Sequence, residues 1–69
     1  MSGVNFGMIF DSRHPGFPMT EADAVLMVRN QAAKEGVAIP PDVEPKVDAD
    51  RKPDGHTDLH VVFEWEESG

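Results

Sequence analysis

Two histidines and an aspartate recur at every second position near the C-terminal end of the sequence: His56, Asp58 and His60. In an extended strand, alternate residues point to the same face. Two imidazoles and a carboxylate form a donor set that binds zinc or a similar divalent cation and leaves a position open for water. The pattern therefore offers a metal site, in a metal-binding protein or in a metal-dependent enzyme.

A single flat strand does not bring these three side chains onto one ion, because same-face neighbours stand about 7 Å apart. A bulge, or a further ligand such as Asp11 or His14, is needed to close the site. The plainer alternative, which we favour, is the solvated outer face of a sheet. No cofactor is expected, and a divalent metal is kept as the alternative.

A second group of chemically capable residues is the segment Asp11-Ser12-Arg13-His14. It follows an expected strand, and ligand sites favour such positions in α/β sheets. Nucleophilic catalysis needs Ser12 to meet a histidine held by a third group, and His14 is too close in sequence to assume that geometry. We expect a turn in which Asp11 or Ser12 bonds the local backbone, with Arg13 and His14 exposed. No catalytic residue is predicted.

Acidic residues recur along the last third of the sequence. Spaced carboxylates on a rigid strand could imitate a phosphate backbone and occupy a basic groove, and a solvated antiparallel face has the same pattern. The residues of this stripe are Asp58, Glu64, Glu66 and Glu67, with Asp48 and Asp50 nearby.

The N-terminal segment predicts a strand with one buried face, because apolar residues alternate there. Gly7 in its interior indicates a bulge or the close approach of another backbone. The segment has no Lys, Glu or Pro to protect an open edge. The inward residues are Val4, Phe6, Met8 and Phe10, and the residues between them are Asn5, Gly7 and Ile9.

The central segment predicts a helix over Glu21 to Glu35. Thr20 and Asp23 resemble a capping box, and Gly36 suits the position just past a helix end. Arg29 falls on or beside the apolar face, either with its head reaching water or bound to a carboxylate. The predicted apolar face consists of Ala22, Val25, Leu26, Ala32 and Ala33, with Val28 at its margin.

The C-terminal half predicts a hairpin. Apolar and charged residues alternate over 43–50, which predicts a weak strand. Pro45 restricts this segment to an edge strand or to irregular structure. Residues 51–55 predict a turn, because Pro53 suits the second position of a turn and Gly55 suits the left-handed position that closes a hairpin. Thr57 to Glu66 predicts the strongest strand. The inward residues of that strand are Leu59, Val61, Phe63 and Trp65.

These elements predict an α+β fold: a two-layer sandwich of order β-α-β-β, in one small domain over 1–69. One amphipathic helix packs on a mostly antiparallel sheet of about three strands. A right-handed crossover leaves the long last strand between the other two. The open face then shows Ile9 and Val62 among charged residues, and the first strand leaves one edge unpaired. That edge is our main structural reason to expect self-association or a partner strand.

Charge and composition disfavour several classes of binding partner and bear on the location of the protein. The 13 acidic against 6 basic residues give a net charge of −7, which disfavours nucleic acids and anionic membranes. No segment has the roughly 20 apolar residues of a membrane span, and the N-terminus does not read as a signal peptide. The sequence has no Cys, which is compatible with a reducing compartment. A cytoplasmic location is expected by default, because the N-terminus shows no signal peptide.

The function expected from these features is that of a small, non-enzymatic interaction or regulatory protein. It acts by self-association, as a homo-oligomer, or by binding a basic protein surface. Such proteins include accessory and inhibitory products of phages and mobile elements. The candidate interaction surface consists of Ile9, Arg29, Asp58, Val62, Glu64 and Glu66. The alternative is the metal-binding function of His56, Asp58 and His60.

Overall fold

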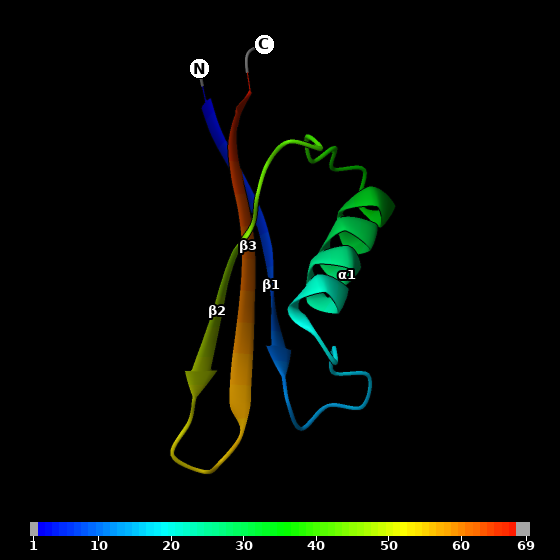
Figure 1. The fold of residues 1–69 in the computed structure, drawn as a ribbon. Coiled ribbons are helices and arrows are strands. Elements are labelled where there is room, and N and C mark those ends of the chain that lie inside the picture. The colour runs from blue at the N-terminus through cyan, green and yellow to red at the C-terminus, as the bar shows by residue number, and fades with distance from the viewer. Residues whose placement is uncertain (1, 68–69) are drawn as a thin grey trace.

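The computed structural model describes residues 2–67. One helix packs on a sheet of three antiparallel strands, in the order β1-β3-β2 (Figure 1). This is the α+β fold predicted from the sequence, with the last strand in the middle of the sheet. The elements are β1 (Ser2–Asp11), α1 (Glu21–Lys34), β2 (Lys46–Arg51) and β3 (Thr57–Glu67).

The strands of the sheet differ in how far they pair. β1 pairs with β3 along its full length in an unbroken register, from Ser2 opposite Glu67 to Asp11 opposite Asp58. β2 stops at Lys46, opposite Val62, so residues 63–67 of β3 pair with β1 alone. In Figure 1 this two-stranded part continues past β2 toward both labelled chain ends.

The core lies between the helix and one face of the sheet. Val28 of α1 and Val61 and Phe63 of β3 are fully buried. The predicted inward alternation is confirmed for seven residues, which are buried or packed against that cluster, whereas Val4 is not part of it. The seven are Phe6, Met8, Phe10, Leu59, Val61, Phe63 and Trp65. Phe17, in the loop after β1, also packs against the core.

The ends of the helix agree with the sequence prediction to within one residue. The Thr20 side chain accepts a hydrogen bond from the Asp23 amide at 3.1 Å, which satisfies one of the free amides of the first turn. Glu35 is the C-cap. Gly36 follows with a φ of +78°, the left-handed conformation that favours glycine.

The predicted apolar face of the helix is right only in part: Ala32 is buried and Val25 packs against the core, but the other predicted members, apart from Val28 at its margin, do not face the sheet. Ala24, Val28 and Ala32 face the sheet and are buried, whereas Leu26 is 57% exposed. Ala22 and Ala33 are exposed too, and Val25 is only half-buried. Apolar residues surround most of this helix, so their spacing does not select one stripe.

The close approach predicted at Gly7 is confirmed. A Cβ on this residue would lie 2.7 Å from the Val61 carbonyl oxygen and 3.0 Å from Cγ2 of Val62. The pairing of β1 with β3 passes through Gly7 without a bulge. The position therefore needs glycine because β3 occupies the space of a side chain.

Candidate functional site

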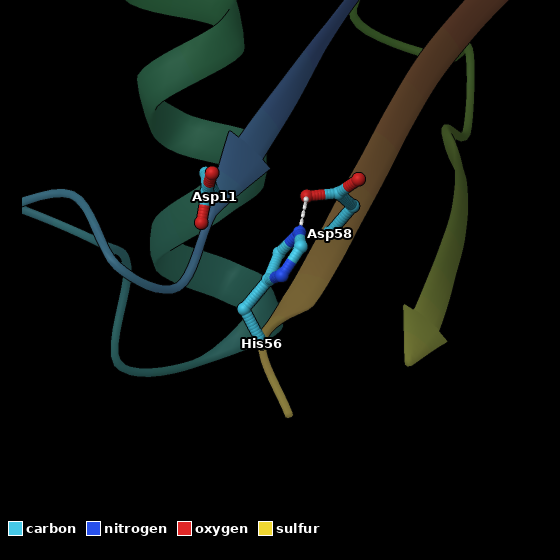
Figure 2. A group of neighbouring side chains, drawn as sticks. All are labelled: Asp11, His56 and Asp58. Atoms are coloured by element: carbon cyan, nitrogen blue, oxygen red, sulfur yellow. Dashed lines mark ion pairs between the residues drawn. The ribbon is translucent and has the colours of Figure 1, made fainter. Parts of the chain in front are cut away.

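A polar cluster lies where the end of β1 meets the start of β3. Asp11 is opposite Asp58 in the register, and His56 immediately precedes β3. Each of the three side chains offers one ligand atom, and these atoms all lie within 4.8 Å of one another (Figure 2). The His56 Nε2 atom lies 3.4 Å from Oδ1 of Asp58. We call Asp11, His56 and Asp58 the polar cluster.

The carboxylate of Asp11 is held by Arg13. The guanidinium donates from Nη2 to Oδ2 at 2.7 Å and from Nε to Oδ1 at 3.1 Å. The Arg13 amide also donates to Oδ1 at 2.9 Å. These bonds hold the pKa of Asp11 well below its usual range and raise the pKa of Arg13. Both oxygens of Asp11 therefore already have a charged partner.

Lys52 supplies a second positive charge beside the cluster. Its Nζ lies 2.7 Å from Oδ2 of Asp50 and 3.9 Å from Oδ2 of Asp58. The hydrogen bond to Asp50 lowers the pKa of that carboxyl and raises the pKa of Lys52. Lys52 thus joins β2 to β3 by opposite charge, and Arg13, whose Nη1 lies 3.3 Å from Oδ2 of Asp54, joins the end of β1 to the turn before β3.

His56 lies between two carboxylates. Its ring contacts Asp54 through Nδ1 and Asp58 through Nε2, and its side chain is only 13% exposed. The His56 amide also donates to Asp54 at 3.2 Å, and this bond and the ring contact lower the pKa of Asp54. The tight turn before β3 thereby fixes the imidazole against the cluster.

The structure brings together part of the predicted metal set. His56 and Asp58 belong to the polar cluster, and Asp11, predicted as a possible further ligand, completes it. His60 lies on the same face of the sheet but one repeat further along β3, opposite Ile9 and Asp48. It is therefore outside the cluster.

The loop residues Ser12 and His14 do not form a nucleophilic pair. The Ser12 hydroxyl accepts a hydrogen bond from the Thr57 amide at 2.8 Å, and the Ser12 amide donates to the Thr57 carbonyl at 2.9 Å. The His14 amide donates to the Asp11 carbonyl at 3.0 Å. These bonds confirm the predicted turn and extend the ladder between β1 and β3 by one residue.

The open face of the sheet carries most of the predicted interaction residues. Ile9 is 64% exposed there, and a shallow depression of about 390 Å³ lies across β2 and β3 beside it. Five predicted residues share this face by strand alternation: Ile9, Asp58, Val62, Glu64 and Glu66. The predicted acidic stripe needs one correction, since Glu67 points to the opposite face.

Arg29 lies in the other layer. Its Nη2 donates to the Val43 carbonyl at 3.1 Å, and its guanidinium carbon stands 4.8 Å from the centre of the Phe63 ring. The predicted roles of Arg29 are a head group that reaches water and a bond to a carboxylate. Neither describes these contacts, which are made to a backbone carbonyl and an aromatic ring. This arginine holds the segment before β2 over the core and lies apart from the other candidate interaction residues.

The outer edge of β1 carries unpaired backbone groups. Hydrogen-bonded and non-bonded residues alternate along an antiparallel pair, and the bond from Ser12 to Thr57 shows that even-numbered residues bond β3. The odd-numbered residues therefore direct their amides and carbonyls outward. Within residues 2–67, no strand lies beyond β1. We call the outward backbone groups of Gly3, Asn5, Gly7 and Ile9 the β1 edge.

Sequence reasoning missed the roles of Asp54 and Lys52 in the site. Asp54 stands two residues before His56 in a glycine-containing turn, which is the signal that could have linked them. Lys52 contacts Asp58 only because β2 pairs with β3. No family model, curated protein or solved structure matches this chain. None of its described helices is long and apolar enough to cross a bilayer.

Proposed function

We propose that this chain is a non-enzymatic interaction protein that binds another polypeptide by strand addition along the β1 edge. The observation that carries the proposal is the edge itself: outward amides and carbonyls from Gly3 to Ile9, with no charged side chain among residues 2–10. Natural sheets protect such edges with charges, prolines, bulges or a covering segment. Main-chain hydrogen bonds to an added strand provide affinity in this mode of recognition.

The polar cluster supports a binding function over catalysis. The carboxylate of Asp11 is bonded to Arg13, and the hydroxyl of Ser12 is bonded to the backbone of β3. These groups join the ends of the strands to one another. They stiffen the sheet that presents the β1 edge, which favours strand addition because a rigid edge loses little entropy on binding.

The test uses an extended peptide in which valine and lysine alternate. Valines would continue the apolar face of β1, and lysines would lie beside the acidic open face, which carries Asp58 and Glu64. We expect amide shift changes at Gly3, Asn5 and Gly7 in NMR spectra on titration.

The matched variants replace Asn5, whose amide faces outward. Asn5→Pro removes that amide without removing a bond to β3, and Pro is tolerated on edge strands; Asn5→Ala keeps the amide. We expect at least tenfold weaker peptide binding for Asn5→Pro and near wild-type binding for Asn5→Ala. Equal binding by all three proteins, or shifts confined to residues away from β1, would overturn the proposal.

A second candidate function is the binding of a divalent cation. One observation favours it: Asp11, His56 and Asp58 place one ligand atom each within 4.8 Å. Carboxylates with an imidazole suit zinc or manganese, although Arg13 must release Asp11 for the site to form. A thermal shift with zinc or manganese that is lost in His56→Gln and kept in His60→Gln would support this function. The absence of any shift with either metal would refute it.

A further inference from the structure

Of the two sheet edges within residues 2–67, the β1 edge is the one that a second acidic chain can approach without facing charged side chains between Gly3 and Ile9. Each copy has a net charge of −7, so two copies repel each other wherever their acidic surfaces meet. Residues 2–10 hold no charged side chain. β2, at the other edge of the sheet, has charged residues over most of its length.

The β1 sequence is also complementary to itself. When two β1 strands run antiparallel about a twofold axis at Gly7, Asn5 of each copy lies opposite Ile9 of the other. An axis at Phe6 would also pair the outward residues, Gly3 with Ile9 and Asn5 with Gly7, so it is the inner face that distinguishes the Gly7 register. On the inner face, the same register sets Phe6 of one copy opposite Met8 of the other, and Val4 opposite Phe10. All these inner pairs are apolar, as cross-strand stabilisation favours.

A depression at the β1 edge matches that register. It has a volume of about 300 Å³ and lies between the end of β1, the following loop and the helix, with Phe10, Phe17 and Met27 in its lining. In the antiparallel register, Val4 of the second copy lies opposite Phe10 and therefore meets this depression. The twofold axis places the equivalent contact at the other end of the edge.

We infer that the occupant of the β1 edge is a second copy of this chain, paired antiparallel through β1 about Gly7. The two sheets then join into one of six strands, in the order β2-β3-β1-β1-β3-β2, with both helices on the same face. This inference rests on the proposed function, since it names the partner of the same edge. The shared edge is only about 30 Å long, so the dimer belongs among small, concentration-dependent interfaces.

The test of this register uses introduced thiols, because the sequence has no Cys. Chains bearing Asn5→Cys are mixed with chains bearing Ile9→Cys and oxidised. Residues paired across a hydrogen-bonded site have Cα atoms about 5.5 Å apart, within reach of a disulfide. Two copies of position 5 stand about 14 Å apart in this register, so Asn5→Cys alone should not cross-link. We expect at least a tenfold excess of mixed disulfide over either homodisulfide.

The solution mass is measured by light scattering over a range of concentrations, at low and high salt. We expect a dimer that strengthens in high salt, because salt screens repulsion between the acidic copies. Asn5→Pro should weaken it at least tenfold and Asn5→Ala should leave it intact, with Trp65 fluorescence confirming that both variants fold.

A monomer at every concentration, or statistical cross-linking among the thiol variants, would overturn the second-copy inference. The proposed function would still stand if the valine–lysine peptide binds the β1 edge of that monomer. If the peptide also fails to bind there, both proposals fall.

Discussion

Replacing Gly7 by alanine should destabilise the protein through a clash between the paired strands. The new methyl carbon would lie 2.7 Å from the Val61 carbonyl oxygen, 3.0 Å from Val62 Cγ2 and 3.2 Å from Val62 Cα. The nearest atom belongs to the backbone of the central strand, so relief requires β1 and β3 to move apart. Overpacking of this kind costs about 1–3 kcal/mol.

One smaller effect opposes this loss. Alanine restricts the unfolded chain more than glycine does, which favours folding by about 0.4–1 kcal/mol. The expected net loss in the free energy of unfolding is therefore about 1–2 kcal/mol. For a domain of this size, whose total stability is about 3–10 kcal/mol, that loss lowers the melting temperature by roughly 4–16 °C.

The assay is urea unfolding followed by Trp65 fluorescence, at a single low protein concentration. Gly3→Ala is the matched control, because it lies on the same strand and face and a Cβ there meets nothing within 4 Å. Its midpoint should equal or slightly exceed that of the wild type. A Gly7→Ala midpoint equal to or above the wild-type midpoint would refute the clash argument.

Three further perturbations test the helix and the polar cluster. Val28→Ala removes a fully buried side chain and should lower the free energy of unfolding by about 2 kcal/mol. Leu26→Ala, on the exposed side of the helix, should change it by less than about 0.5 kcal/mol. Equal losses in thermal unfolding would contradict the observed helix face. Thr20→Ala should cost about 1 kcal/mol by removing the N-cap, seen as reduced helix content and a lower melting temperature, and Thr20→Ser should restore both. Because the Arg13 hydrogen bonds lower the pKa of Asp11 from 3.8, ionised Asp11 stabilises the fold above that pH and loses this effect as the solution is acidified through the folded-state pKa. The urea midpoint should therefore fall more between pH 6 and pH 2.5 in the wild type than in Asp11→Asn, and parallel curves would argue against the pair.

The strands could be predicted from the sequence because their periodicity reflects a sheet with one covered face. Leu59, Val61 and Phe63 occupy alternate positions of one strand, and only one register buries all three. The helix ends could be predicted because Thr20 and Gly36 act within a few residues of themselves. These are local signals, and the structure agrees with them.

The face of the helix and the full polar cluster could not be predicted in the same way. Leu26 and Val28 are both apolar, and which of them faces the sheet depends on the angle at which the helix docks. Asp11 reaches His56 only because β1 pairs with β3 in one register. Contacts between residues this far apart in sequence follow from the whole fold and leave no trace in local spacing.

The central position of β3 has a consequence for how the chain folds during synthesis. β1 and β2 each pair with β3 and do not pair with one another, so no part of the sheet can form before β3 has been made. A ribosome adds about 5–20 residues per second. Throughout the synthesis of the chain between β1 and β3, the backbone groups on both edges of β1 have no partner strand. Nascent chains on neighbouring ribosomes of one messenger RNA therefore meet while β1 is still unpaired. The order of the strands gives such chains an opportunity to associate through β1 before either has folded.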